Sequence, residues 1–444
     1  MSFEVELNDW LQAMPSLDGD PAKDRQSLGS YVKTGEALLK GISRKVDRSP
    51  EESTHARQIY QACRGLRRDF LGLHAAWLYS VLTKGHSLRK TLGELVFEAA
   101  EYCPGLVPTR AQIAEERNKR QVDKEGVEID QGLFFHALLR SPSVGAHLAE
   151  SALRPTERAL ELSAQFRDAQ QIDLGSVLIE RRGYAAHLTV NNQYCLNAED
   201  NRLIDDMETA VDLALLDSQI RAGVLRGGVM THPRYAGRRV FSAGINLKAL
   251  HAGQISFVDF LLRRELGYIN KIARGLLLEN DGVGVYRKPV RTLEKPWIAA
   301  VDGFAVGGGA QLLLVFDRVI AAADSYFSLP AAQEGIIPGV ANLRLTRFLG
   351  SRKARQVISY GRKIWAHEPD AGLLFDEVVE PMEMDTAVER NVLQLSSPAV
   401  VPNRHMMNLA EEPLDLFLQY ASEFAMLQAE RLYGQDVLDK VSRF

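Results

Sequence analysis

The sequence VDGFAVGGGAQ at residues 301–311 carries the strongest structural signal in the chain. Its apolar start predicts a strand, and the three glycines at 307–309 predict a tight turn into a helix that begins near Ala310. Glycine lets the backbone approach a ligand closely, and the free N–H groups at the start of a helix can bind an anionic oxygen. The glycine spacing is not that of a Walker loop or of a dinucleotide-binding loop. A purely structural turn is the alternative explanation of the glycines alone.

Two other glycine-containing segments accompany this turn. They are FSAGINL at residues 241–247, and FSLP at 327–330 followed by GIIPG at 335–339. Together with residues 301–311, they resemble the crotonase superfamily, which is also called the enoyl-CoA hydratase/isomerase superfamily. The resemblance runs from about residue 177 to residue 381, and it implies an α/β fold with a core of ββα repeats arranged as a spiral.

The resemblance also implies where a CoA thioester binds. In the family, one backbone N–H from each glycine loop binds the thioester oxygen, and the corresponding residues here are Ile245 and Gly308. Two such donors stabilise the enolate that forms when a proton leaves the α-carbon. Lys248 falls where family members carry a basic residue near the CoA phosphates, although a solvated surface lysine explains it nearly as well.

The chain departs from a hydratase at the positions that add water. Hydratases of this family use two glutamates there, and the corresponding residues are Gln311 and Ala331. An amide cannot transfer a proton and alanine has no functional group, so water addition is disfavoured. Glu334 lies three residues further along, where its spacing does not fit the missing glutamate, and we expect a structural or surface role for it.

One branch of the superfamily fits these departures. The segments LNAED at 196–200 and FLLRRE at 260–265, Gln311, and a long helical N-terminal extension resemble the cofactor-independent dioxygenases of glycopeptide-antibiotic biosynthesis. Those enzymes act on (3,5-dihydroxyphenyl)acetyl-CoA, and the resemblance covers almost the whole chain. It implies conversion of this thioester and O2 to 3,5-dihydroxyphenylglyoxylate and CoA through an enolate and a peroxide, with no metal and no cofactor.

The resemblance assigns a role to individual side chains. Glu199, Arg264 and Gln311 surround the dihydroxyphenyl ring and bind its hydroxyl groups, which is reasonable for a carboxylate, a guanidinium and an amide. An apolar pocket for O2 is formed by Leu247, Ile336 and Ile337. The structural alternatives are a helix-terminal carboxylate or amide, a solvated arginine and ordinary core aliphatics. The neighbouring Arg263 leaves open which of the two arginines faces the ring.

Other functions stay open from the sequence. A different enolate-forming crotonase, such as an isomerase or decarboxylase of an arylacetyl-CoA or another acyl-CoA, is the main alternative. A non-catalytic protein that binds a partner or RNA is disfavoured by the net charge of −4 and by the retained glycine loops, and we expect no nucleic-acid partner. His232 is the one histidine that we would test as a base or a CoA contact, although a surface-loop position explains it better.

The 444 residues are too many for one ordinary core and change in pattern near residue 175. We predict a helical N-terminal domain at 1–175 and a crotonase domain at 176–444, in which a helical segment at about 385–444 mediates oligomerisation into a homotrimer or hexamer. A β-hairpin is predicted at 177–190. The highly charged residues 115–128 are expected to form an exposed, flexible connection.

The composition excludes several classes of protein. With 46% hydrophobic and 25% charged residues, the chain is typical of a globular protein. Its three cysteines are scattered and form no CxxC pair, which disfavours a disulfide scaffold or a structural zinc and favours a reducing compartment. No apolar stretch is long enough to cross a membrane. We therefore expect a cytoplasmic enzyme.

Overall fold

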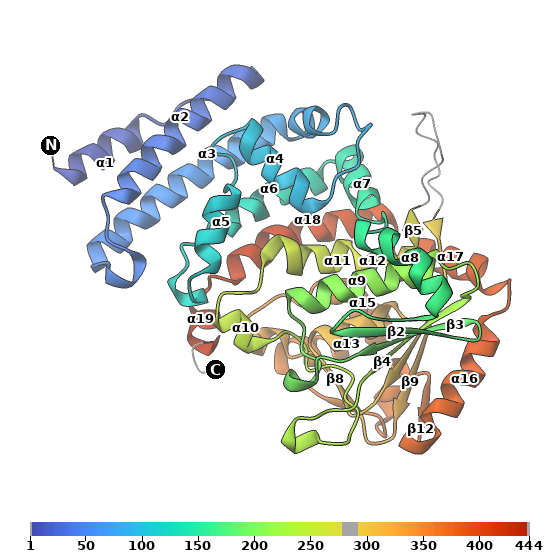
Figure 1. Ribbon diagram of the computed structural model, residues 1–444. Helices are drawn as coiled ribbons and strands as arrows, with labels where there is room; N and C mark the ends of the chain where they lie inside the picture. The colour runs from blue at the N-terminus through green and yellow to red at the C-terminus, as the bar shows by residue number, and fades with distance from the viewer. Residues whose placement is uncertain (1, 278–291, 442–444) are drawn as a thin grey trace.

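The computed structural model describes residues 2–277 and 292–441 (Figure 1). The N-terminal part is helical as predicted, and three of its helices begin with a capping box, at Ser49, Thr91 and Thr109. Its helices are α1 Phe3–Gln12, α2 Pro21–Lys40, α3 Pro50–Leu82, α4 Leu92–Tyr102, α5 Arg110–Arg117, α6 Glu128–Arg140, α7 Pro142–Ser151 and α8 Glu157–Ala169.

The following residues form a mixed sheet with the strand order β1-β2-β3-β4-β7-β9-β12. The predicted hairpin is present as antiparallel β2 and β3, and each strand pair from β3 to β12 is parallel. The strands of the sheet are β1 Gln171–Asp173, β2 Val177–Arg182, β3 Ala185–Val190, β4 Ala222–Gly227, β7 Trp297–Val301, β9 Arg318–Ala322 and β12 Glu377–Val379. Strand β7 is buried along its whole length, as expected for a parallel strand covered on both faces.

Two small sheets and short helices complete this part of the fold. A three-stranded sheet contains β8 Phe304–Val306, β10 Tyr326–Ser328 and β11 Ile364–Trp365, and a two-stranded sheet contains β5 Leu276–Leu277 and β6 Thr292–Leu293. The helices are α9 Asn201–Leu216, α10 Leu247–His251, a π-helix Phe257–Leu262, α11 Arg263–Leu266, α12 Tyr268–Arg274, α13 Gly308–Leu312, α14 Ala331–Glu334 and α15 Ala341–Tyr360. The expected α/β architecture with a helical N-terminal region is confirmed.

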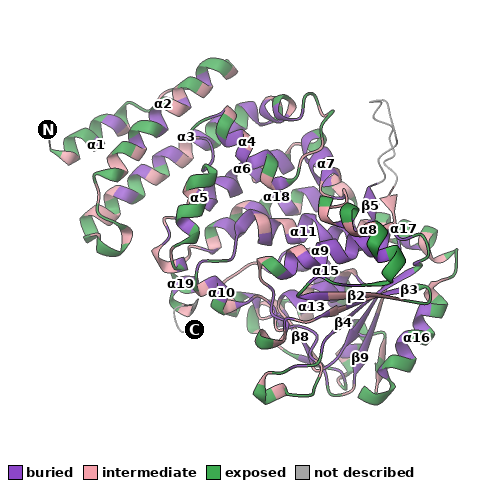
Figure 2. Cartoon of the chain, in the orientation of Figure 1, coloured by how far each residue is buried: buried purple, intermediate pink, exposed green. Residues whose placement is uncertain are grey.

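The C-terminal helices return to the N-terminal region. They are α16 Met384–Leu395, α17 Val400–Glu411, α18 Leu414–Arg431 and α19 Gln435–Val441. Helix α18 lies directly against α6 (Figure 1), and its apolar face is buried within the same chain. One continuous apolar core therefore joins the helical region to the sheet (Figure 2). The oligomerisation role of residues 385–444 and the division near residue 175 stay predictions.

The expectation of an exposed, flexible connection at residues 115–128 was only partly correct, because some of its side chains are exposed and others are interior. Glu116, Lys124 and Glu128 are almost fully buried, and the Glu116 carboxylate accepts hydrogen bonds from the backbone N–H groups of Glu125 and Gly126 at 3.1 and 3.0 Å. Buried charged groups need such partners, and these partners come from the folded chain. A charged stretch without apolar periodicity can therefore be interior.

None of the helices in the described residues is long and apolar enough to cross a membrane.

Candidate active site

A cavity of about 810 Å3, including its open mouth, lies where the three glycine-containing segments meet. Its walls come from Glu199, from the π-helix and α11, and from the C-terminal helix α18. The lining residues are Glu199, Ala243, Gly244, Ile245, Leu247, Phe260, Leu261, Arg264, Glu265, Val306, Gly307, Gly308, Gln311, Leu329, Pro330, Ala331, Glu334, Ile336, Ile337, Pro338, Gly339 and Phe424. This set contains every predicted site residue except Lys248.

The loop at residues 241–247 is fixed to strand β8 by backbone hydrogen bonds. Ser242 donates its N–H to the Phe304 carbonyl at 3.2 Å and accepts the N–H of Val306 at 2.9 Å. Gly244 has φ +86°, which glycine adopts without strain, and a Cβ there would approach the Val306 carbonyl to 3.0 Å. The two glycine loops are thereby held against each other.

Two backbone N–H groups are left free at this junction. Among the described residues, none accepts a hydrogen bond from the N–H of Ile245 or of Gly308, although both residues line the cavity. Helix α13 begins at Gly308, two residues earlier than expected from the sequence, so the Gly308 N–H has no partner within the helix. The pair can therefore bind one ligand oxygen.

Arg264 is the centre of a buried polar cluster beside these donors. Its Nε and Nη2 donate to the two carboxylate oxygens of Glu199, each at 3.0 Å. Its Nη1 donates to Glu265 Oε1 and to Gln311 Oε1, both at 2.7 Å, and Nη2 also donates to the Gly308 carbonyl at 2.7 Å. All five N–H groups of the guanidinium thus have protein partners.

This arrangement fixes what the cluster can offer a ligand. Burial alone would lower the pKa of Arg264, but the interactions with the nearby carboxylates, above all Glu199 and also Glu265, outweigh it, so the pKa is raised and the arginine stays charged. The Gln311 oxygen faces Arg264, and no described residue accepts a hydrogen bond from its Nε2, so this group can donate to a ligand. Burial raises the pKa of Tyr268, whose neutral hydroxyl donates to Glu199 Oε1 at 3.2 Å.

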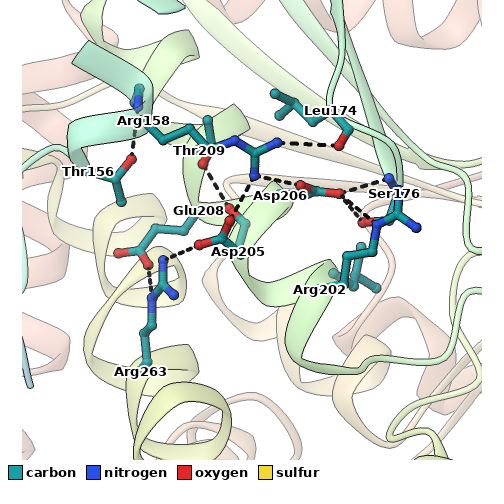
Figure 3. A network of polar contacts seen from close by, with 12 residues as sticks. Thr156, Arg158, Leu174, Ser176, Arg202, Asp205, Asp206, Glu208, Thr209 and Arg263 are labelled. Atoms are coloured by element: carbon teal, nitrogen blue, oxygen red, sulfur yellow. Dashed lines mark hydrogen bonds and ion pairs between the residues drawn. The ribbon is translucent and has the colours of Figure 1, made fainter. Parts of the chain in front are cut away.

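The neighbouring Arg263 faces away from the cavity, into the network of Figure 3. It donates to Glu208 Oε2 at 2.5 Å and to Asp205 Oδ1 at 3.0 Å on α9, and Asp205 also accepts from Arg158 of α8 at 2.8 Å. Arg264 lines the cavity, and Arg263 anchors α11 to the helices behind it.

The remaining predicted residues fall in two places. Leu247, Ile336 and Ile337 line the cavity and are partly buried, as the expected apolar pocket requires. Lys248 is exposed and lies in an adjoining groove together with His232. The groove shares Ala243, Ile245 and Leu247 with the cavity, so an elongated ligand can occupy both.

Several lining residues were missed from the sequence. Glu265 supports Arg264 and also accepts the Val340 N–H at 3.1 Å, and Phe424 of α18 is buried against the cavity. Glu334, expected at the surface or in a structural role, also lines the cavity and forms an ion pair with Lys440 at 3.5 Å. The signal for Glu265 was its adjacency to Arg264, whereas nothing near Phe424 in the sequence distinguished it.

Comparison with known proteins places the chain in a family. Residues 282–421 match the enoyl-CoA hydratase/isomerase family model. The (3,5-dihydroxyphenyl)acetyl-CoA 1,2-dioxygenase of Amycolatopsis orientalis is 54% identical over 430 residues, which are 97% of this chain and 98% of that protein. The chain belongs to the enoyl-CoA hydratase/isomerase, or crotonase, family.

Other crotonases match a smaller part of this crotonase chain. The short-chain-enoyl-CoA hydratase of Clostridium acetobutylicum is 32% identical over 267 residues, 60% of this chain and 90% of that protein. A crystal structure of an enoyl-CoA hydratase from Mycobacterium avium subsp. paratuberculosis K-10 superposes with a TM-score of 0.49 at 21% identity, covering 61% of this chain and 99% of that one. The similarity to the dioxygenase, in contrast, includes the helical N-terminal region.

Proposed function

We propose that this crotonase is a dioxygenase that converts (3,5-dihydroxyphenyl)acetyl-CoA and O2 to 3,5-dihydroxyphenylglyoxylate and CoA, without a metal or another cofactor. The similarity to the Amycolatopsis dioxygenase over 97% of the chain carries this proposal. The cavity supports it chemically, because two free N–H donors adjoin a polar cluster suited to a phenol-bearing ring.

The first chemical step is the loss of an α-proton. The thioester oxygen accepts hydrogen bonds from the N–H groups of Ile245 and Gly308, so negative charge that develops on this oxygen is stabilised. Each such donor contributes about 3–4 kcal/mol to stabilisation of the transition state. The aryl ring delocalises the same charge and makes the enolate electron-rich at the α-carbon.

The enolate then supplies the electrons that reduce O2. A C–O bond forms at the α-carbon, and the resulting peroxide attacks the thioester carbonyl, so that the C–S bond breaks and CoA leaves as a thiolate. Cleavage of the O–O bond with loss of the second α-proton gives the α-keto acid. The overall balance is one thioester and one O2 to one glyoxylate and one CoA, and the substrate supplies all the electrons.

The ring hydroxyls fit the groups that remain available in the polar cluster. The Glu199 carboxylate accepts a hydrogen bond from one hydroxyl, and the Gln311 Nε2 donates to the oxygen of the other. Arg264 has no N–H left for the substrate, so it acts by holding Glu199 and Gln311 in place.

Gln311→Leu should reduce selectivity for the hydroxylated ring. Leucine keeps the volume but removes the Nε2 donor, and a lost hydrogen bond to a ligand hydroxyl costs about 1–2 kcal/mol. We expect kcat/KM to fall about tenfold to thirtyfold for (3,5-dihydroxyphenyl)acetyl-CoA and less than about threefold for phenylacetyl-CoA. Gln356→Leu, at an exposed position of α15, is the matched control. Equal losses for both substrates would contradict direct recognition by Gln311.

The experiment that tests the proposed function measures dissolved O2 and free thiol together. Metal-stripped protein is incubated with (3,5-dihydroxyphenyl)acetyl-CoA, and we expect one O2 consumed for each thiol released. Deuterium exchange at the α-carbon without O2 uptake would instead identify an isomerase or decarboxylase type of crotonase. The positions 311 and 331 carry no carboxylate, so we expect no hydration of an enoyl-CoA.

A further inference from the structure

One face of helix α18 is bound to the loop that carries Ile336 and Ile337. Tyr420, Phe424 and Gln428 are four residues apart and therefore share this face. The Tyr420 hydroxyl donates to the Gly339 carbonyl at 2.8 Å, and the Ile337 N–H donates to Gln428 Oε1 at 2.8 Å. Phe424 lies between these two hydrogen bonds, is 3% exposed, and lines the cavity.

The opposite side of α18 is held by α6 of the helical N-terminal region. A Cβ at Gly132 of α6 would lie 2.5 Å from the Ala429 Cβ and 2.8 Å from the Ala425 carbonyl, so the two helices touch backbone to backbone. Ser422 also donates its hydroxyl to the His136 carbonyl at 2.9 Å. Helix α6 thereby sets how far α18 can move from the cavity.

We infer that Phe424 closes the apolar end of the acyl cavity, and that α6 of the N-terminal region holds it there. The inference rests on the proposed function and assigns a task to the helical extension. Ile336, Ile337 and Phe424 then form a chamber in which the α-carbon of the enolate meets O2 and not water. A cavity opened at Phe424 admits water, which returns a proton to the α-carbon and regenerates the thioester without oxidation.

Two rates measured on the same variants test how the enolate divides between oxidation by O2 and return of a proton from water. Exchange of the α-hydrogens in D2O without O2 reports the enolate that forms and takes a deuteron back from solvent, and O2 uptake in air reports the enolate that is oxidised. For Phe424→Ala we expect the ratio of oxidation to exchange to fall about tenfold, and for Phe424→Leu about threefold, since leucine leaves a smaller gap. Phe417→Leu is the matched control, because Phe417 is fully buried on the same helix but does not line the cavity, and its ratio should not change.

The role of α6 is tested by a pair of glycine substitutions. The Cβ added in Gly132→Ala displaces α18 from its contact with α6 and moves Phe424 out of its packed position, so that gaps open in the chamber wall. We therefore expect the ratio to fall about threefold to tenfold. Gly72→Ala, in α3, should leave the ratio unchanged, because the added Cβ meets no atom within 4 Å among the described residues outside its own stretch of helix. Because exchange itself requires a folded site, a variant that still exchanges has kept its structure.

The outcomes separate the inference from the proposed function. If the unmodified protein consumes no O2 with the dihydroxyphenyl substrate, the proposed function is overturned. If the unmodified protein consumes O2 and Phe424→Ala keeps the same ratio, only the inference is overturned. An equal fall in Phe417→Leu would also overturn the inference, because the effect would then come from loosening α18 in general.

Discussion

Gly308→Ala should lower oxygen consumption by about a thousandfold. A Cβ at this position would overlap the Glu199 carboxylate and would lie 3.0 Å from Arg264 Nη2. Neither group can yield easily, because Glu199 and Arg264 are almost fully buried and bound to each other by two hydrogen bonds. The added methyl group therefore displaces both the Gly308 N–H and the ring-binding carboxylate.

The measurement compares kcat for O2 uptake with the anaerobic rate of α-hydrogen exchange. Both should fall together, because the enolate itself loses its stabilising donor. Gly372→Ala is the matched control, since Gly372 is exposed and an added Cβ there meets no atom of the described residues within 4 Å beyond its chain neighbours. More than a tenth of normal exchange in Gly308→Ala would contradict the assignment of the Gly308 N–H.

The glycine turns could be predicted from the sequence because their requirements are local. Gly244 and Gly307 have φ values of +86° and +53°, which other residues adopt only with strain, and each follows an apolar run. Strand β7 was recognisable for a similar reason, since its five residues are all apolar and all buried. Such features depend on neighbours in the chain and not on the tertiary fold.

The polar cluster could not be derived in this way. Its members, Glu199, Arg264 and Gln311, come from distant parts of the chain. They were identified only through the family resemblance. The resemblance could not show that every N–H of Arg264 is occupied, because that depends on Glu265 and on the Gly308 carbonyl. The resemblance therefore suggested that Arg264 contacts the ring directly, whereas the geometry favours a supporting role for this arginine.

Buried charges and cavity walls show a second limit of prediction from the sequence. Glu116 and Glu128 belong to a stretch that a hydrophobic pattern assigns to the surface, yet the fold supplies them with hydrogen-bond partners. Phe424 is one of several apolar residues of α18, and only its position between Tyr420 and Gln428 shows that it faces the cavity. Apolar periodicity predicts that a helix has a buried face, but not what that face contacts.

Arg264→Ala should reduce both stability and activity, with little discrimination between substrates. Removal of the guanidinium leaves the Glu199 and Glu265 carboxylates buried without their cation, which costs about 3–5 kcal/mol in the free energy of unfolding. Oxygen uptake should fall about a hundredfold or more with (3,5-dihydroxyphenyl)acetyl-CoA, and by a similar factor with phenylacetyl-CoA, because the Gly308 carbonyl and Gln311 lose their common support.

Arg264→Lys separates charge from geometry. Lysine keeps the positive charge but cannot reproduce the paired donation of Nε and Nη2 to Glu199, so we expect most of the stability and only part of the activity to return. Urea unfolding and kcat/KM for the two thioesters measure the two effects. A loss confined to the dihydroxyphenyl substrate, with unchanged stability in Arg264→Ala, would mean that the guanidinium itself binds the ring hydroxyls. Saturation of all five N–H groups by protein acceptors favours the opposite result, in which Arg264 acts on the substrate only through Glu199, Gln311 and the turn at Gly308.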